Sequence, residues 1–130
     1  YTKYLNDLWC LDLKTLKWQC LSSNSSISGT GGKRNSKPHP QRKLSATWID
    51  DSSNELYVHG GKTRDGYVLN DLWKFSLRTK KWTEVRPKKK SLPASRYGHC
   101  GVYYNGCGYI WGGNLIKQQS IPYIQSNLEV

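Results

Sequence analysis

The sequence predicts an all-β protein built from repeated antiparallel hairpins, and two observations support this prediction. Residues 4–21, YLNDLWCLDLKTLKWQCL, and residues 67–85, YVLNDLWKFSLRTKKWTEV, match each other at an offset of 64, so that Trp9 aligns with Trp73 and Trp18 with Trp82. Self-similarity at a period of some tens of residues is typical of repeat architectures. Within both copies apolar residues recur at every second position, which is the period of a β-strand.

The first of these segments is predicted to be a hairpin with apolar groups on both faces. Trp9, Leu11 and Leu13 fall on one side of its first strand, and Leu8 and Cys10 fall on the other. A strand that is apolar on two sides is typical of stacked sheets. In each copy a short polar turn then leads into a second strand, which completes the hairpin.

A second kind of hairpin lies between and after these copies. Residues 42–61, RKLSATWIDDSSNELYVHGG, match residues 96–113, RYGHCGVYYNGCGYIWGG. Each begins with an Arg, has two β-prone runs around a polar or Gly-rich turn, and ends in Gly-Gly. Paired glycines at a strand end indicate positive φ or a close backbone approach that a Cβ would block.

These motifs together resemble the kelch repeat, whose blades of about 50 residues build β-propellers. The resemblance rests on the Arg-Tyr-Gly-His before one hairpin, the two Gly-Gly endings, the two Asn-Asp-Leu-Trp stretches and the tryptophan that follows each. It implies four-stranded antiparallel blades in an incomplete propeller, because closure takes about 4 to 8 blades. The structural motif residues are Trp9, Trp18, Gly60, Gly61, Trp73, Trp82, His99, Gly112 and Gly113.

The order of motifs predicts half a blade, a complete blade and another half. Because the sequence has no Met, we expect a fragment or processed product, with the remaining blades supplied by the parent chain or by other copies. Asp7 and Asp71, at the starts of matched strands, are expected to bond local backbone. The expected segments are the C and D strands of a first blade (1–21), a flexible basic Ser/Gly-rich loop (22–41), a complete blade (42–85), a basic loop (86–95), the A and B strands of a following blade (96–113), and a tail or degenerate strands (114–130).

The excess of basic residues is expected to lie on one face. The chain has 20 Lys and Arg against 9 Asp and Glu, a net charge of +11. Alternating strand directions would put residues 22–43, 62–69 and 86–96 at one end of the blades, and these loops hold all of the net charge. We expect them to bind a protein with an acidic segment, although Lys-rich loops also serve solubility alone. The predicted partner-binding residues are Arg34, Lys62, Arg64, Lys88, Lys89, Lys90 and Arg96.

No catalytic, cofactor or metal site is expected. The four cysteines lack Cys-x-x-Cys spacing, and no phosphate-cradling, Gly-x-Ser-x-Gly or His-Glu-x-x-His motif occurs. His99 is expected to be structural, Cys100 and Cys107 to be buried or half-buried, and Trp111 to lie in a blade core. Nucleic acid is not an expected partner, because no nucleic-acid-binding motif is present. A membrane is not expected either, because no window approaches the ~18 apolar residues of a transmembrane helix.

The resemblance implies a protein–protein interaction module. Many such propellers are substrate receptors for cullin-based ubiquitin ligases or cytoskeletal scaffolds. The few, irregularly spaced cysteines favour a reducing compartment, the cytoplasm or nucleus. Two alternatives stay open: part of a kelch-fold enzyme, galactose-oxidase-like or sialate-mutarotase-like, and a purely structural propeller segment.

Overall fold

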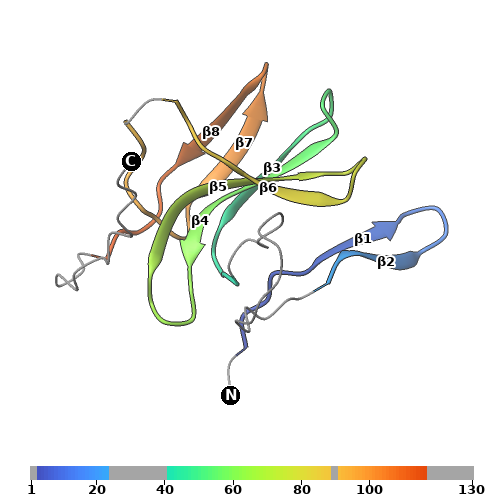
Figure 1. The fold of residues 1–130 in the computed structure, drawn as a ribbon, viewed down its shortest axis with the longest axis horizontal. Coiled ribbons are helices and arrows are strands. Elements are labelled where there is room, and N and C mark those ends of the chain that lie inside the picture. Colours follow the sequence, from blue (N-terminus) through green and yellow to red (C-terminus); the bar gives the residue numbers. More distant parts are fainter. Residues whose placement is uncertain (1–2, 24–40, 89–90, 117–130) are drawn as a thin grey trace, which may run out of the picture.

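A computed structural model describes residues 3–23, 41–88 and 91–116, and this part of the chain contains strands and no helix. Figure 1 shows the strands as three groups along the chain, with the β1–β2 hairpin extending away from the others. The strands are β1 (Leu8–Asp12), β2 (Lys17–Ser22), β3 (Ala46–Asp50), β4 (Glu55–Lys62), β5 (Val68–Ser76), β6 (Lys81–Val85), β7 (Cys100–Tyr104) and β8 (Cys107–Trp111).

The strands form three antiparallel sheets. The central sheet has four strands in the order β3-β4-β5-β6, while β1-β2 and β7-β8 are two-stranded hairpins. This arrangement of one four-stranded blade between two half blades confirms the predicted all-β class. In the described residues there is no helix of the length and apolar character needed to cross a membrane.

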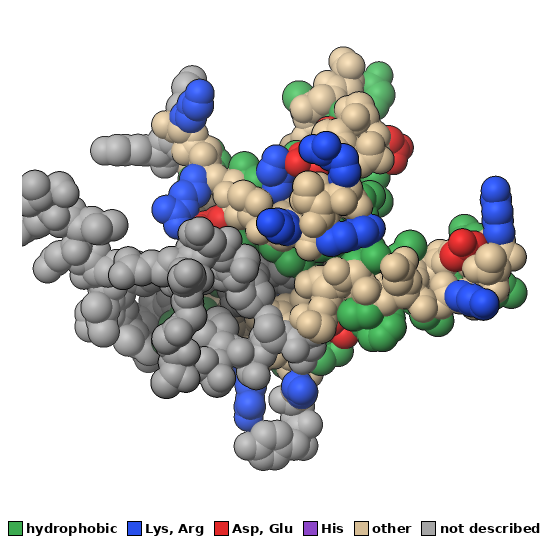
Figure 2. All heavy atoms as spheres, turned by 45° about the vertical axis from the view of Figure 1, so that its right-hand side comes forward, with side chains coloured by type: hydrophobic (Ala, Val, Ile, Leu, Met, Phe, Trp, Pro, Cys, Tyr) green, Lys and Arg blue, Asp and Glu red, His purple; other side chains and the backbone are tan. Residues whose placement is uncertain are grey.

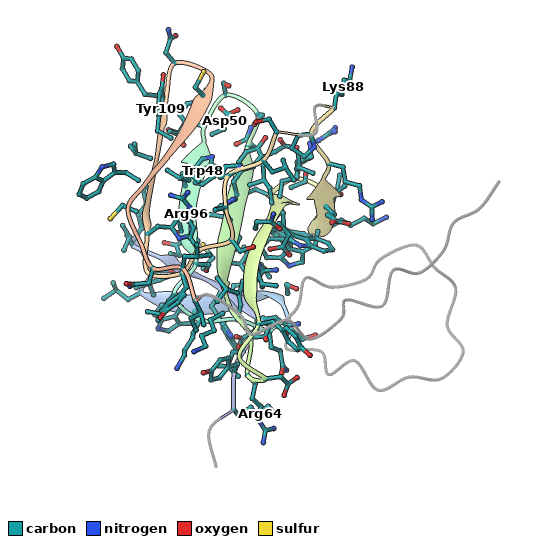
Figure 3. All side chains as sticks on the ribbon, turned by 90° about the vertical axis from the view of Figure 1, so that its left-hand side faces the viewer. Trp48, Asp50, Arg64, Lys88, Arg96 and Tyr109 are labelled. Atoms are coloured by element: carbon teal, nitrogen blue, oxygen red, sulfur yellow. The ribbon has the colours of Figure 1, made fainter. Side chains whose placement is uncertain are left out.

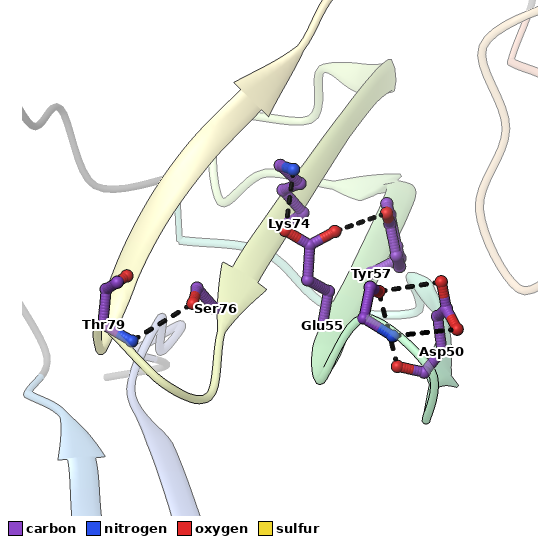
Figure 4. A network of polar contacts seen from close by, with 7 residues as sticks. Asp50, Glu55, Tyr57, Lys74, Ser76 and Thr79 are labelled. Atoms are coloured by element: carbon purple, nitrogen blue, oxygen red, sulfur yellow. Dashed lines mark hydrogen bonds and ion pairs between the residues drawn. The ribbon is translucent and has the colours of Figure 1, made fainter.

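The hairpin turns are held by short local hydrogen bonds. Asp50 ends β3, and its carboxylate accepts hydrogen bonds from the hydroxyls of Ser52 (2.6 Å) and Ser53 (2.7 Å), which lower the pKa of Asp50 to about 2. At the end of β5 the Ser76 hydroxyl accepts the Thr79 amide proton at 3.1 Å (Figure 4). Such side-chain bonds to nearby groups are the reason that Asp and Ser favour turns.

The apolar core lies in the central sheet. Phe75 is fully buried and packs against Trp82 with ring centroids 5.0 Å apart, and Trp73 is 8 % exposed. Their sequence counterparts in the first hairpin have a different environment: Trp9 is 52 % exposed and Trp18 is 65 % exposed. The same motif is therefore core in one blade and surface in the other.

The β7–β8 hairpin packs against the central sheet through Trp48. A Cβ added at Gly108 would lie 2.6 Å from the Trp48 ring, and one at Gly101 would lie 2.8 Å from it. Trp48 also stacks on Tyr57, with ring centroids 5.8 Å apart and nearly parallel planes. Two glycines facing one indole thus allow two sheets to approach closely.

Three expectations about buried residues in the last hairpin were wrong. Cys100 and Cys107 are exposed, and Trp111 is 80 % exposed. The register pairs Cys100 with Trp111, so both side chains lie on the same face of the hairpin, opposite the face of Gly101 and Ile110 that meets the central sheet. Within the described residues, no further sheet covers this outer face.

The glycines that end β4 let the next hairpin dock. Gly60 has φ +63°, and a Cβ there would lie 2.7 Å from the Arg96 carbonyl oxygen. The amide of Gly61 donates a hydrogen bond to that same carbonyl at 2.9 Å. Gly61 and Gly113 make an equivalent close approach within their own hairpins, to the carbonyls of Lys43 and Tyr97, where an added Cβ would lie 2.8 Å from the oxygen in both cases. The Gly-Gly endings therefore serve both positive φ and close backbone approach.

Candidate functional site

A buried ion pair joins the start of the complete blade to its third strand. Arg42 precedes β3, and its guanidinium donates to both carboxylate oxygens of Asp71 in β5, at 2.7 and 2.8 Å. Arg42 also donates to the Gly60 carbonyl at 2.8 Å, and Trp73 Nε1 donates to Asp71 at 2.8 Å. Burial acts to raise the pKa of Asp71, but the hydrogen bonds and charge of Arg42 outweigh it and hold that pKa below its usual value.

This ion pair extends one sequence interpretation and corrects another. Asp71 was expected to bond local backbone, and it does so through its own backbone amide, but its carboxylate also accepts hydrogen bonds from Arg42 and the Trp73 indole. Arg42 was counted as loop charge, yet its side chain is only 3 % exposed. The signal that could have revealed the pair is an Arg before each Gly-Gly hairpin and an Asp two residues before each matched Trp.

Each flanking hairpin carries one half of the same arrangement. In the first, Trp9 Nε1 donates to Asp7 at 2.9 Å, as Trp73 does to Asp71. In the last, Arg96 donates to the Gly112 carbonyl at 3.2 Å, as Arg42 does to Gly60. Within the part of the chain that the structure describes, no carboxylate lies within ion-pair distance of Arg96.

Two histidines meet beneath the docked hairpin. His59 Nδ1 and His99 Nε2 lie 2.9 Å apart, and both rings are buried. Burial and the neighbouring His99 lower the pKa of His59 to about 4, and burial with the nearby Arg96 lowers that of His99. Both rings are therefore neutral at pH 7, so that one nitrogen donates and the other accepts. His99 Nδ1 has no hydrogen-bond partner among the described atoms.

One end of the molecule carries basic side chains beside tyrosines. Lys43 and Lys62 pair through two backbone hydrogen bonds of 3.0 and 2.9 Å. The Lys43 ammonium lies 4.8 Å from the centre of the Tyr4 ring, and the Lys62 ammonium lies 5.4 Å from that of Tyr97. Arg64 extends the charge into the exposed β4–β5 loop. We call Lys43, Lys62 and Arg64 the basic end.

The predicted partner-binding residues do not all lie at this end. Lys62 and Arg64 do, whereas Figure 3 places Lys88 at the opposite end of the molecule from Arg64. Arg96 lies between the ends and is bonded to Gly112. Arg34, Lys89 and Lys90 lie outside the described residues. Figure 2 likewise shows Lys and Arg in separate groups on one face, including the tip of the β1–β2 hairpin.

The path of the chain after β6 explains the position of Lys88. β6 ends at Val85, which pairs with Leu72, so the chain leaves the sheet before it reaches the β4–β5 loop that follows Lys62. It then turns back, and Lys88 lies toward the end of the molecule that holds Asp50 (Figure 3). Antiparallel direction alone predicts one shared end, but this reversal separates Lys88 from Arg64.

A groove of about 520 Å³ is lined by residues of the central sheet, of segment 86–93 and of the β7–β8 hairpin. Its walls are largely apolar, and Glu84 and Arg86, which pair at 2.8 Å, lie beside them. In the described part of the chain no three His, Cys, Asp or Glu residues group closely enough to hold a metal ion. The main lining residues are Trp48, Tyr57, Leu72, Val85, Leu92 and Ile110.

The blade geometry agrees with a family comparison. A sequence model of the KLHDC2/KLHL20/DRC7 Kelch-repeats domain matches residues 1–127. The chain belongs to this kelch-repeat family. Kelch-repeat domains generally serve protein–protein interaction, so the predicted resemblance is confirmed at the level of family and fold.

Several curated kelch relatives match most of this chain. Host cell factor 1 of Rattus norvegicus is 32 % identical over 124 residues, covering 84 % of this chain and 6 % of the relative. Kelch domain-containing protein 10 of Homo sapiens is 35 % identical over 111 residues, covering 83 % and 22 %. Rho GTPase-activating protein gacHH of Dictyostelium discoideum is 31 % identical over 83 residues, covering 63 % and 5 %. The chain thus spans less than a quarter of these relatives.

Proposed function

We propose that this chain is part of a kelch propeller that binds another protein, and that its basic end contacts an acidic segment of that partner. The carrying observation is the position of Lys43, Lys62 and Arg64 on adjoining segments at one end of the central sheet. Loops presented by a rigid scaffold are frequent sites of recognition. Among the described residues of the β4–β5 loop, only Asp65 opposes this charge.

The tyrosines beside the lysines support the same proposal. Cation–π attraction holds the ammonium groups of Lys43 and Lys62 over the Tyr4 and Tyr97 rings. Because these side chains are already ordered, they lose less conformational entropy when a partner binds. Tyr67, 49 % exposed in the β4–β5 loop, adds an aromatic contact surface beside the charge. Aromatic and basic groups together are enriched at protein interfaces.

The test is binding of a fluorescein-labelled octaglutamate peptide, followed by anisotropy at low and physiological salt. The variant is Lys62→Glu with Arg64→Glu, and the matched control is Arg78→Glu with Lys80→Glu in the exposed β5–β6 turn. Both variants change the net charge equally. We expect the first to weaken binding at least about 10-fold and the control to leave it nearly unchanged, since steering acts over about a Debye length.

Two results would contradict this proposal. Equal weakening by both variants would mean that net charge alone attracts the peptide. Tighter binding of a labelled oligothymidine of matched charge, with the same dependence on Lys62 and Arg64, would assign the basic end to nucleic acid instead. In the full parent protein, we propose one of two roles: substrate receptor of a ubiquitin ligase, or scaffold. Capture of a cullin complex by the parent protein would support the receptor role, and its absence would favour the scaffold.

A further inference from the structure

Four serines and threonines of this chain share one charge pattern. Each follows two adjacent basic residues, which stand three and two positions before the hydroxyl-bearing residue. Basophilic protein kinases select their substrates by such charge patterns, because acidic groups beside the kinase active site bind the basic side chains. The four residues are Ser36, Ser45, Thr83 and Ser91. Ser36 lies outside the described residues, and the structure gives the other three different surroundings.

The fold holds the basic residues before Ser45 away from a kinase. The Arg42 side chain is only 3 % exposed and is bonded to Asp71. Leu44 has a positive φ of 57°, and its carbonyl accepts the Gly98 amide proton at 2.7 Å. A kinase binds its substrate segment in an extended form, which a residue in the left-handed region does not have. Ser45 therefore carries the pattern in the sequence but does not present it on the surface.

Thr83 is held within a strand. It lies in β6 and pairs with Lys74 of β5, so its backbone belongs to the central sheet. Lys80, three positions earlier, has a φ of 57°, and its amide donates to the Ser76 carbonyl at 2.8 Å. A kinase could bind Thr83 in extended form only after β6 had separated from β5, which costs the free energy of that local opening.

Ser91 lies in the connection between β6 and β7, where neither constraint applies. This connection is anchored at its ends, by β6 and by the Arg96 amide, which donates to the Leu69 carbonyl at 3.0 Å. Between these anchors, the described positions 86–88 and 91–95 make no backbone–backbone hydrogen bond to any described residue. The segment around Ser91 can therefore take up an extended form without the loss of sheet hydrogen bonds.

The recognition residues around Ser91 are on the surface. Ser91 itself is exposed, and Leu92, the next residue, is 46 % exposed. Lys88, three positions before Ser91, is exposed and points away from the molecule in Figure 3. The Arg86 side chain is 83 % exposed, and its ion pair with Glu84 is of the surface kind that contributes little. Both basic groups are thus available to a kinase.

We infer that Ser91 is a phosphorylation site for a basophilic protein kinase, and that the fold withholds Ser45 and Thr83 from the same enzyme. The Ser91 hydroxyl oxygen attacks the γ-phosphorus of ATP, the bond from that phosphorus to the bridging oxygen of the departing ADP breaks, and a carboxylate of the kinase accepts the hydroxyl proton. Positions 86–92 hold four basic residues and no acid. The phosphate adds about −1.5 to −2 charges at pH 7, so it cancels up to about half of that positive charge. The site is separate from the basic end and does not depend on the proposed function.

The test is phosphorylation of the full 130-residue chain by the catalytic subunit of cyclic-AMP-dependent protein kinase with magnesium and ATP. Every chain carries Ser36→Ala, so that this residue makes no contribution. Incorporation of radiolabelled phosphate gives initial rates, and tandem mass spectrometry maps the modified residues. We expect phosphate on Ser91, and an initial rate at least about 10-fold lower when Ser91→Ala is added, because the other patterns are not presented.

A matched pair of variants tests the recognition residues. Lys88→Gln with Lys89→Gln removes the two basic residues of the Ser91 pattern and should lower the rate about as much as Ser91→Ala does. Lys80→Gln with Lys81→Gln removes the same charge before Thr83 and should leave the rate unchanged. Equal loss in both variants would mean that net charge alone attracts the kinase, which would overturn the inference.

Two peptides separate the charge pattern from the fold. Peptides of residues 39–51 and 85–97 hold the patterns of Ser45 and Ser91 in flexible chains, and both should be substrates. In the 130-residue chain only Ser91 of this pair should be modified. A Ser91 that stays unmodified in the chain or in its peptide would refute the inference. Phosphate on Ser45 or Thr83 of the chain at the rate of Ser91 would refute it as well.

Discussion

The buried pair of Arg42 and Asp71 gives a quantitative prediction about stability. Asp71→Asn removes the charge that compensates a guanidinium whose side chain is 3 % exposed. Breaking a buried ion pair by neutralising one partner costs about 3–5 kcal/mol, because the other charge stays buried and uncompensated. With a slope of about 2 kcal/mol per molar urea, this corresponds to a fall of about 1.5–2.5 M in the unfolding midpoint.

The matched comparison is Asp7→Asn, which changes the same motif in the first hairpin. Asp7 bonds the Trp9 indole, and an Asn carbonyl can still accept that hydrogen bond. The expected loss is below about 1 kcal/mol. Urea unfolding followed by tryptophan fluorescence at one fixed, low protein concentration measures both variants.

Replacing both partners provides the internal check. Arg42→Met with Asp71→Leu removes the buried charge together with its counter-charge, so it should cost less than Asp71→Asn alone. If Asp71→Asn destabilised the chain no more than Asp7→Asn does, the pair would not be buried as described, and the reasoning from burial to cost would fail.

Two further predictions concern the contact between the central sheet and the last hairpin. Gly108→Ala should destabilise the chain by about 1–3 kcal/mol, because its Cβ would lie 2.6 Å from the Trp48 ring, and Trp48→Phe in the same chain should recover part of that loss in urea unfolding. The pKa of His59 is about 4 in the fold and about 6.5 unfolded, so the unfolded chain binds the proton first. The contribution of His59 to the free energy of unfolding should thus be complete above about pH 6.5 and fall by up to about 3 kcal/mol toward pH 4. In the His59→Gln variant this fall between pH 6.5 and pH 4 should be absent. A free energy of unfolding with the same pH dependence in both chains would contradict the buried, neutral pair with His99.

The sequence could predict local elements because their causes are local. Period-2 alternation and the offset between Trp9 and Trp73 indicate the hairpins, and the Gly-Gly endings indicate positive φ, which Gly60 and Gly61 show at +63° and +98°. The turn at Asp50 likewise depends on hydroxyls two and three residues away. Apart from the repeat offset, each of these signals acts within a few residues of the chain.

The candidate sites could be predicted only in part. The sequence placed Lys62 and Arg64 in one loop, and the structure keeps them together at the basic end. It grouped Lys88 with them because strand direction alternates, but that rule does not predict that the chain leaves β6 at Val85 and turns back. The position of a charged residue in space depends on the path of the chain beyond each strand, which packing against neighbouring segments decides.

The sequence by itself determined the family, the strand-and-turn pattern and the net charge of this protein, because these follow from residue types and their spacing. Only the tertiary structure decided that Arg42 is buried against Asp71 while Arg96 lies without a described acid, and that Trp73 is core while Trp9 is surface. Identical motifs contribute differently to the free energy of folding, because their burial and charge pairing depend on which sheets stack beside them. That stacking is a property of the assembled blades, which no single motif specifies.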